Sequence, residues 1–477
     1  MSTGAVSEGG WKAGKPSRGS PRVGKGGTGS WNRSEETREE HSILVSVSTE
    51  QQRIAARAAE DKQRCFVSLN HLLSPEWVTE AFQRTRKDGA KGVDGQGAEE
   101  YQAELAANSR RLCEEARSGS YKAPPVKRGY VPKNETEVRP IGMPTFTDKV
   151  LQRAVVMILE PIYEQDFLDC SYGFRPNRSA HQALETIWQQ VMSMGGCWLL
   201  EADIRKFFDK LDPRHLRDIL DRRVRDGVLR RLIDKWLKAG VWEAGECTFP
   251  ETGTPQGGVI SPLLSNIYLH AVLDEWFVKQ VQPLLHGRAF LVRYADDFVM
   301  GFEYREDAER VLRVLHKRFA RFGLSLHPEK TRLVDFTRPR GKEPAGGGSF
   351  DFLGFTHYWG ASRRGNWVVQ RKTAKDRLRR AIQRIENWCR AVCHNEWKWQ
   401  HWMLSLKLRG HYAYYGITGN MRQLQRFLRE VERRWHYWLS RRTRGGLGMK
   451  WEHFAALMTA YPLPQPRIVR SALAVKP

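Results

Sequence analysis

The sequence predicts an α+β protein that ends in a separate helical unit. Two apolar runs, Gly195–Ile204 and Phe290–Phe302, have the character of buried strands. Around them lie segments whose apolar residues recur at helical spacing. Residues 361–450 show helical spacing and hold 7 of the 17 tryptophans, so we expect a second, all-helical unit after the sheet.

Four segments are expected along the chain. Residues 1–47 form a flexible basic tail, because the first 30 residues hold nine Gly with Ser, Pro, Lys and Arg and almost no apolar side chain. Residues 48–360 carry the mixed unit and residues 361–462 the helical unit. Residues 463–477 are expected to be a short C-terminal tail.

Local signals predict the first elements in order. Helical spacing begins near Thr49. The run Ser74–Glu76 supplies an N-cap serine, a proline at the first helical position and an acid in the first turn, and it predicts a helix to about Lys87. Residues 121–146 hold many Pro, Lys and Arg, which favours short strands and turns with basic side chains outward. Thr147 is then expected to cap a helix with one apolar stripe.

Three aspartates stand where the predicted strands end. Asp296 and Asp297 interrupt the run Phe290–Phe302, and Asp203 closes the run Gly195–Ile204. Two interpretations are open for the adjacent pair: a hairpin turn with both acids in water, or a partly buried pair that needs a cation. Asp203 favours the second, because three carboxylates at neighbouring strand ends suit Mg²⁺, with Mn²⁺ as a substitute. Two such ions can activate an attacking hydroxyl and stabilise the leaving oxygen of a phosphoryl group.

A glycine-rich loop lies between the two strands along the chain. Gly253–Gly258 allows close backbone approach, and Ser261 followed by Pro262 predicts the N-cap and first position of a helix. Such a loop can be merely a tight turn. Its place in the order is more informative: an aspartate strand, a Gly-Gln loop with a helix, then an Asp-Asp hairpin.

The charge of the chain indicates a polyanionic partner. The 78 Lys and Arg exceed the 54 Asp and Glu by 24, and such an excess attracts nucleic acid. Residues 361–450 hold 22 Lys and Arg against 5 Asp and Glu, so +17 of this charge lies in the helical unit.

No run of about 18 uncharged apolar residues and no apolar signal core occurs, which argues against a membrane-spanning or secreted protein. The seven cysteines include no C-x-x-C pair and favour reduced thiols in the cytoplasm.

Several motifs in this order resemble the reverse transcriptases, in particular the group II intron-encoded reverse transcriptase/maturase family. The resemblance runs from about Leu72 to Tyr461. A lone Tyr-Ala-Asp-Asp would be a weak signal, whereas six motifs in order are highly specific. The motifs are Lys91–Gly95, Arg139–Pro144, Ser171–Pro176, Tyr294–Asp297, Lys330–Thr331 and Phe352–Phe355.

The resemblance implies a right-hand polymerase, with fingers and an antiparallel-sheet palm followed by an α-helical thumb and maturase X domain. Asp203, Asp296 and Asp297 take the place of the family's catalytic, metal-binding aspartates. The main-chain carbonyl of Ile204 would contact the second ion.

The resemblance also implies a set of nucleotide-binding residues. Lys133 and Arg139 would grip the triphosphate, where charge-assisted donors are needed. Phe208 matches the bulky residue that blocks a ribose 2′-hydroxyl. Gln256 would lie beside the incoming nucleotide, and Lys330 would neutralise or protonate the pyrophosphate. From the residues alone, Phe208 can equally be a core aromatic, and the cations can be ordinary surface charges.

Two further regions are implied to bind nucleic acid. The segment that supports the primer end would consist of Phe352, Leu353, Gly354 and Phe355. In the helical unit, basic side chains suit phosphates and aromatic rings suit unpaired bases, although most of the tryptophans are expected to pack between helices. The candidate RNA ligands there are Arg377, Arg380, Arg409, Tyr414 and Tyr415.

The implied function is that of an RNA-directed DNA polymerase encoded by a group II intron, which joins dNTPs to a DNA primer on an RNA template. The protein would also bind structured intron RNA as a splicing maturase and support retrohoming into target DNA. We expect a cytoplasmic, nucleoid-associated ribonucleoprotein, with an organelle as the alternative. The oligomeric state, a dimer included, is left open.

Other functions of the same fold stay open at this stage. They are a reverse transcriptase repurposed for phage defence or a CRISPR system, an RNA-binding maturase without polymerase activity, and an RNA-dependent RNA polymerase. The tyrosine-containing pattern of the helical unit disfavours the first alternative, the three aspartates disfavour the second, and Phe208 disfavours the third.

Many family members carry a Cys/His-rich endonuclease after the X domain. Only residues rich in Pro, Arg and Val follow Tyr461, so we expect no cleavage of target DNA by this chain; priming from a nascent strand is compatible.

Overall fold

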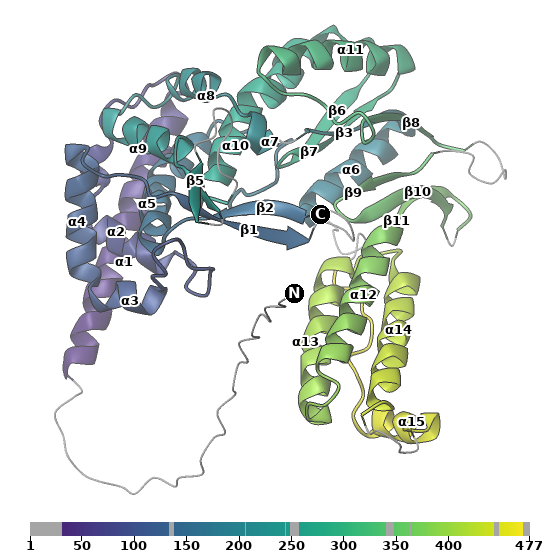
Figure 1. Ribbon diagram of the computed structural model, residues 1–477. Coiled ribbons are helices and arrows are strands. Elements are labelled where there is room, and N and C mark those ends of the chain that lie inside the picture. The colour runs from purple at the N-terminus through teal and green to yellow at the C-terminus, as the bar shows by residue number, and fades with distance from the viewer. Residues whose placement is uncertain are drawn as a thin grey trace, which may run out of the picture.

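The elements of the computed structural model fall into three parts: N-terminal helices, a central sheet covered by helices, and a helical unit near the C-terminal end (Figure 1). A small sheet lies beside the N-terminal helices and a larger one at the centre, so helices and sheets are both present, as the predicted α+β class requires. No helix in the described part of the chain is both long and apolar enough to cross a bilayer. The described residues are 31–132, 138–205, 207–243, 245–248, 257–339, 348–362, 364–442 and 448–470, with side chains from Ile43 on except those of Phe208 and Asp209.

The N-terminal helices form one wall of the main hydrophobic core. Leu73, Val78 and Phe82 are buried there together with Leu151, and the first helix packs along α5. Their bounds are α1 Trp31–Glu60, α2 Pro75–Gln83, α3 Ala98–Ala103, α4 Leu105–Ser118 and α5 Phe146–Tyr163.

Helix α1 begins at Trp31, whereas the sequence predicts helical spacing only from Thr49 and a flexible tail over residues 1–47. Val47 and Ile54 are buried in the core, and Ile43 packs beside them. Their spacing of four and seven residues places them on one face of a helix. The first 30 residues lie outside the described part, so the predicted flexibility there stays a prediction.

A hairpin-based sheet in the order β2-β1-β4-β5 projects from these helices toward the rest of the molecule (Figure 1). It confirms the short strands predicted within residues 121–146, with Lys127 and Arg139 exposed. The bounds are β1 Val126–Pro132, β2 Val138–Met143, β4 Val241–Glu243 and β5 Glu246–Thr248, with helices α8 Pro213–Leu220 and α9 Gly227–Leu237 before β4.

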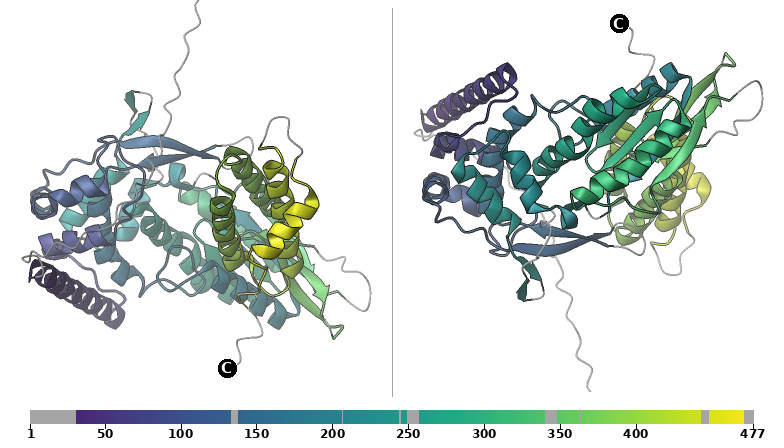
Figure 2. Two further views of the ribbon diagram at one scale, coloured as in Figure 1. Left: turned by 90° about the horizontal axis from the view of Figure 1, so that it is seen from below. Right: turned by 90° about the horizontal axis from the view of Figure 1, so that it is seen from above.

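The central sheet is antiparallel throughout, in the order β6-β7-β3-β8. Helix α6 packs on one face beside Leu199, and helix α11 packs on the other beside Leu200 (Figure 2). Both predicted buried strand runs are confirmed, the second as the hairpin β6–β7. The bounds are α6 Ala180–Met194, β3 Gly196–Asp203, α7 Phe207–Lys210, α10 Ser261–Leu269, β6 Ala289–Tyr294, β7 Asp297–Phe302, α11 Arg305–Arg321 and β8 Arg332–Thr337.

The boundary predicted at residues 360 and 361 falls inside a second hairpin. Strands β10 and β11 pair in register and bury Trp359 and Val369 against the central sheet. Their side chains alternate in burial with the period of a strand, so the helices begin only at Lys375. The bounds are β9 Phe350–Phe352, β10 Phe355–Ala361, β11 Trp367–Thr373, α12 Lys375–Ala391, α13 Trp397–Tyr415, α14 Met421–Leu439 and α15 Trp451–Ala460.

Residues 463–470 dock on the helical unit, whereas the sequence predicts a short tail over 463–477. Leu463 is buried in the core of that unit. The amides of Val469 and Arg470 both donate to the Gly416 carbonyl, at 2.7 and 3.0 Å. Apolar burial and paired main-chain groups therefore hold this segment, and the last seven residues lie outside the described part.

Two helix starts follow N-cap chemistry, one of them at a different residue from the one predicted. Ser74 caps α2, as predicted, although the helix ends at Gln83 and not near Lys87. Thr145, not Thr147, caps α5, because its hydroxyl accepts the amide hydrogen bond from the residue three positions on, at 3.2 Å.

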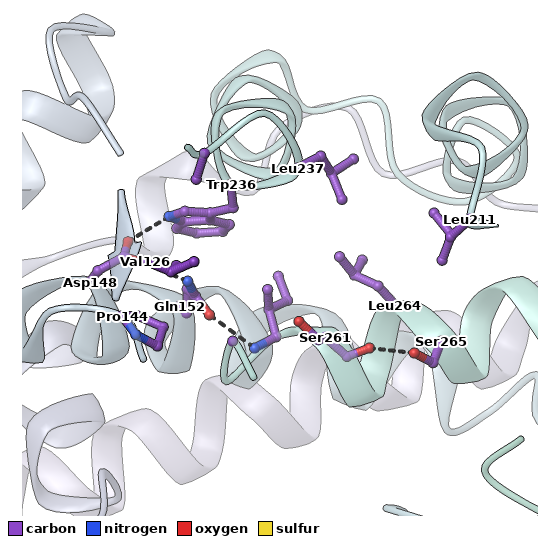
Figure 3. Close-up of a pocket in the computed structure, with 13 residues that line it drawn as sticks. Val126, Pro144, Asp148, Gln152, Leu211, Trp236, Leu237, Ser261, Leu264 and Ser265 are labelled. Atoms are coloured by element: carbon purple, nitrogen blue, oxygen red, sulfur yellow. Dashed lines mark hydrogen bonds between the residues drawn. The ribbon is translucent and has the colours of Figure 1, made fainter. Parts of the chain in front are cut away.

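A small cavity of about 30 Å³ lies where α5, α9 and the start of α10 meet (Figure 3). Beside it, Asp148 accepts hydrogen bonds from the Trp236 indole at 2.7 Å and from the Tyr121 hydroxyl. The Gln152 amide donates to Asp148 at 2.9 Å and accepts the main-chain amide just before α10 at 3.2 Å. Ser261 is the first residue of α10 and not its cap, because the residue before it already has helical dihedrals. The network fixes the start of α10 against α5.

We expect the stability contribution of Asp148 to depend on pH. Burial raises its pKa from 3.8 to about 6, so the folded protein binds this proton more tightly than the unfolded chain. The stabilisation is complete below pH of about 4 and is lost as the pH rises through about 6. Asp148→Asn, which cannot ionise, should therefore gain about 3 kcal/mol in unfolding free energy relative to the wild type between about pH 4 and pH 7. Urea unfolding measures this difference, with the exposed Asp335→Asn as the control; a difference that stays constant with pH would contradict the expectation.

Candidate active site

The three aspartates singled out in the sequence lie together at one end of the central sheet. In the strand register Asp203 of β3 is opposite Asp297 of β7, which in turn pairs with Tyr294 of β6. Strands β6 and β7 are therefore joined by the two-residue turn Ala295–Asp296. The hairpin itself is as one interpretation predicts, but its turn is Ala295–Asp296 and not the Asp-Asp pair, and Asp296 is half-buried rather than in water. The same hairpin brings the pair beside Asp203.

Burial and mutual repulsion raise the pKa of two of these carboxyls. Loss of hydration among the surrounding protein atoms is the main cause for Asp297, whose pKa is raised to about 7 although its side chain is exposed at the surface of the pocket, and the charges of Asp296 and Asp203 add to it. Burial also raises the pKa of Asp296, with Asp203 again adding. Lys330 acts in the opposite direction on both, and its ammonium pairs with Asp203. This sheet end therefore concentrates negative charge that a cation would stabilise.

The donor atoms present fit a divalent cation. Carboxylate oxygens and the main-chain carbonyl of Ile204, the residue after Asp203, are the hard ligands that such cations prefer. Among the residues that the structure describes, no three acidic, His or Cys side chains converge closely enough to enclose an ion. Asp203 is instead bonded to Lys330, so a cation at this place competes with that ammonium for the carboxylate.

A pocket of about 390 Å³ opens beside the aspartates. Asp203 and Asp297 line it together with the segment Phe352–Gly354. Lys330 and Arg377 also line it, and both lower the pKa of Asp297. The pocket thus offers acids for cations and positive side chains for an anionic ligand within one space.

The predicted primer-end segment is a tight loop between β9 and β10. Phe352 and Phe355 are buried, whereas Leu353 and Gly354 between them have φ angles of 49° and 81°. Such positive angles are unfavourable for a leucine, so neighbouring groups must hold the loop. The Tyr414 hydroxyl, from α13, donates to the Leu353 carbonyl at 2.8 Å.

The second tyrosine of the pair packs against the same loop. The ring centre of Tyr415 lies 5.2 Å from that of Phe355. A Cβ added to Gly354 would lie 3.1 Å from the Tyr415 hydroxyl, so this position favours glycine for space as well as for its φ angle. The Tyr-Tyr pattern of the helical unit therefore braces the loop at the pocket.

The predicted nucleotide-binding residues are only partly described. Arg139 is exposed on β2. Its positive charge lowers the pKa of Asp296, so its side chain lies near enough to the aspartates to interact with them electrostatically. Lys133, Gln256 and the side chain of Phe208 lie outside the described residues. The loop before α10 nevertheless approaches β2, because a Cβ on Gly257 would collide with the Gly142 carbonyl.

The candidate RNA ligands of the helical unit occupy different surroundings. Arg377 and Arg409 are exposed. Arg380 pairs with Asp376 on α12 and is 25% exposed. Tyr414 and Tyr415 are half-buried against the loop just described, so their accessible surface for RNA is small. RNA binding by these residues stays a prediction.

The sequence reasoning missed Arg293, which lies inside strand β6 and is fully buried. Its guanidinium donates to the carbonyl of Ala295 in the aspartate turn at 3.0 Å. A charged residue in the middle of an apolar strand was the available signal, because a buried charge needs a partner.

Comparisons with known proteins identify a family and several relatives of this chain. The family described as "Reverse transcriptase (RNA-dependent DNA polymerase)" matches residues 131–357. Protein YkfC of Escherichia coli (strain K12) is 38% identical over 288 residues, which cover 53% of this chain and 75% of that protein. The group II intron-encoded protein LtrA of Lactococcus lactis subsp. cremoris is 37% identical over 271 residues, 56% of this chain and 43% of LtrA. Nuclear intron maturase 1, mitochondrial, of Arabidopsis thaliana is 34% identical over 95 residues, 20% of this chain and 13% of that protein.

We expect Tyr414→Phe to loosen the loop between β9 and β10. The variant loses the hydrogen bond to Leu353, a loss of about 1 kcal/mol in the free energy of local opening. The amide of Ala374, which donates to the Gly354 carbonyl at 3.0 Å, should then exchange with deuterium about fivefold faster. Tyr412→Phe is the matched control, since the buried Tyr412 hydroxyl has no hydrogen-bond partner among the described residues. Equal exchange in the two variants would contradict the role given to Tyr414.

Proposed function

Because this chain belongs to the reverse transcriptase family and is thereby an RNA-directed DNA polymerase, we propose that the end of its central sheet is the polymerase site. The observation that carries the proposal is the meeting of Asp203, Asp296 and Asp297 beside a pocket flanked by Lys330 and Arg377. In this proposal the central sheet is the palm, the N-terminal helices with β1 and β2 are the fingers, and the helical unit is the thumb with the X domain.

The three aspartates and the carbonyl of Ile204 would hold two divalent cations. We propose Mg²⁺, with Mn²⁺ as a substitute, because every donor is an oxygen. When bound, such ions activate the 3′-hydroxyl of the primer and stabilise the leaving oxygen. Lys330, half exposed beside Asp203, is positioned to donate a hydrogen bond or proton to the departing pyrophosphate.

The other predicted residues would orient the substrates around this centre. Arg139 and Lys133 would bind the triphosphate of the incoming dNTP, with charge-assisted hydrogen bonds as the main interaction. Phe208 would exclude a 2′-hydroxyl, and Gln256 would lie beside the nucleotide. The primer end would rest on the loop Phe352–Phe355, whose place in the same pocket as the aspartates supports this role.

We propose further that the chain is an intron-type reverse transcriptase that binds structured intron RNA as a maturase and takes part in retrohoming into target DNA. Its similarity to the group II intron-encoded protein LtrA and to an intron maturase supports this, as does the charge of +17 on residues 361–450. A maturase without polymerase activity is disfavoured, because it would not need the three clustered aspartates. The seven cysteines, all free thiols, fit our proposal of a cytoplasmic ribonucleoprotein.

We expect the purified protein to extend a DNA primer on an RNA template with dNTPs and Mg²⁺. Asp296→Asn should lower the rate by at least about 10³-fold, because the charge that stabilises the transferred phosphoryl group through bound cations is lost. Asp335→Asn is the matched control, an exposed aspartate on β8 whose carboxylate bonds only Thr337 among the described residues. Primer extension by Asp296→Asn at the wild-type rate would disprove the assignment of the site.

Intron RNA binding should depend on arginines of the helical unit. Arg409→Gln should weaken binding of the intron RNA and lower the slope of log affinity against log salt by about 1, the effect of one lost phosphate contact. Filter binding at several salt concentrations measures this, and Arg310→Gln on the exposed face of α11 is the control. An unchanged slope for Arg409→Gln would remove this residue from the RNA surface.

A further inference from the structure

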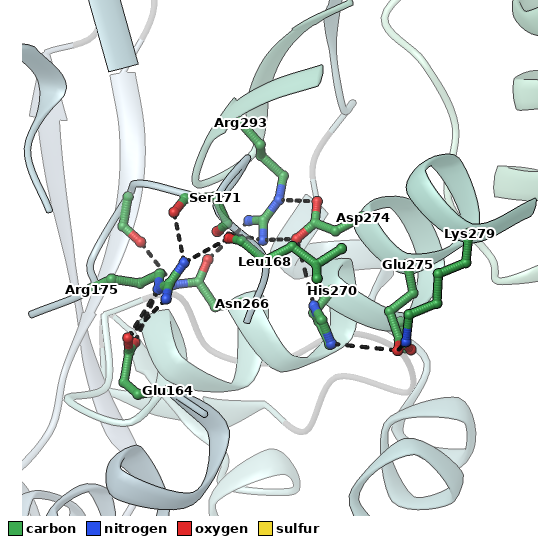
Figure 4. Close-up of polar contacts among 12 residues, drawn as sticks. Glu164, Leu168, Ser171, Arg175, Asn266, His270, Asp274, Glu275, Lys279 and Arg293 are labelled. Carbon is green, nitrogen blue, oxygen red and sulfur yellow. Dashed lines mark hydrogen bonds and ion pairs between the residues drawn. The ribbon is translucent and has the colours of Figure 1, made fainter. Parts of the chain in front are cut away.

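Arg293, a fully buried charged residue of the central sheet, contacts the turn Ala295–Asp296. Arg293 of β6 has no exposed surface, and neither has its partner Asp274 (Figure 4). Arg293 Nε donates to Asp274 Oδ1 at 2.8 Å, and Arg293 Nη2 donates to Asp274 Oδ2 at 2.5 Å. The two side chains therefore form a bidentate pair, a geometry that fixes the plane of the guanidinium.

The remaining three donors of Arg293 are also used. An arginine has five N–H groups, and two of them bind Asp274. Nη2 also donates to the Ser171 hydroxyl at 2.8 Å, and Nη1 donates to Asn266 Oδ1 at 2.9 Å and to the Ala295 carbonyl at 3.0 Å. No other side chain has five donors in a rigid planar fork, so the site is specific for arginine.

The carbonyl that Arg293 binds belongs to a strained turn. Ala295 has a φ angle of 58°, and two-residue hairpin turns with this angle favour glycine. Gly173 lies against the same turn, because a Cβ there would collide with the Ala295 amide nitrogen. Asn266 donates to the Gly173 carbonyl at 2.7 Å, so one side chain, Asn266, links the packing loop to the guanidinium. The turn is thus held from two sides.

The acceptor side of the network depends on an irregular helix. Asp274 closes the π-helical segment His270–Asp274 that continues α10, and a second π-helical segment, Trp276–Val281, follows. A π-helical turn shifts the side chains that follow it around the helix axis, and such segments occur often at functional sites. Asp274 is held in a fully buried position where an unpaired carboxylate would be unfavourable. The pairing with Arg293 supplies the partner that this buried carboxylate needs.

We propose that Arg293 is a positioning residue for nucleotidyl transfer: by binding the Ala295 carbonyl it fixes the turn and so the direction in which Asp296 presents its carboxylate. The inference rests on the proposed polymerase function. Arg293 touches neither substrate nor cation. Its effect is geometric, because a misplacement of about 1 Å at a reacting group can lower a rate by about 10²-fold.

The test compares two lysine variants of buried arginines. Arg293→Lys keeps the positive charge, but a lysine cannot reach Asp274 and the Ala295 carbonyl together in the planar geometry. The matched control is Arg223→Lys. Arg223 is also buried, pairs with Asp166 at 2.8 Å and donates to three main-chain carbonyls, all far from the aspartate turn in the chain. Primer extension at saturating dNTP, the Mg²⁺ concentration for half-maximal rate, primer–template affinity and Tm are measured for both.

We expect Arg293→Lys to lower kcat by about 10²-fold and to raise the Mg²⁺ midpoint several-fold, with primer–template affinity unchanged. Arg223→Lys should lower Tm to a similar extent and leave kcat and the Mg²⁺ midpoint at wild-type values. If Arg293→Lys and Arg223→Lys show the same kcat and Mg²⁺ midpoint at a temperature where both are folded, the proposal is overturned.

A milder variant covers the case in which Arg293→Lys does not fold. Ser171→Ala removes one acceptor of the guanidinium and leaves the other four bonds, so kcat should fall by a few-fold, with the Mg²⁺ midpoint shifted in the same direction. Wild-type kcat and midpoint in Ser171→Ala would then overturn the proposal. An inactive wild-type protein would instead count against the polymerase function itself, which separates the two failures.

Discussion

Three like charges repel one another at the end of the central sheet, where Asp203 and Asp297 face each other in register and Asp296 occupies the adjoining turn. Burial is the main cause of the raised pKa values of Asp296 and Asp297, and this repulsion adds to it. Left alone, such a cluster would spread apart or take up protons. The surrounding structure opposes the spreading, since strand pairing fixes the main chain and the buried Arg293 binds the carbonyl of the turn.

The groups that offset this charge come from parts of the chain far apart in sequence. Lys330 follows α11, Arg377 begins the helical unit, and Arg139 extends from the β1–β2 hairpin. Each acts on the pKa of at least one aspartate. The acids therefore lie where basic side chains from the three parts of the fold approach one another. The pocket beside them has both signs of charge, with Lys330 from the central part and Arg377 from the helical unit among its lining residues. A polyanionic chain and the cations that accompany it can share such a space.

Much of this could be predicted from the sequence, for reasons of period and chemistry. The apolar runs around Asp203 and Asp297 have strand character, and the basic stretch after residue 361 has helical spacing. The sequence predicts Tyr414 and Tyr415 as RNA ligands, which stays a prediction. It does not predict their contacts with the loop between β9 and β10, because long-range packing leaves no local pattern. The same limit hid the partners of Arg293, which lie 19, 27 and 122 residues away. Local chemistry locates the acids; the contacts that position them belong to the tertiary structure.

The docked segment 463–470 has a consequence for protein engineering. It closes over Gly416, the residue that follows the tyrosine pair, and Ile417 next to it belongs to the core beside the central sheet. Truncating the chain before residue 463 would therefore remove the segment that packs where the helical unit meets the central sheet. A minimal enzyme designed from this scaffold should keep these eight residues, and a fusion partner is better attached beyond them than in their place.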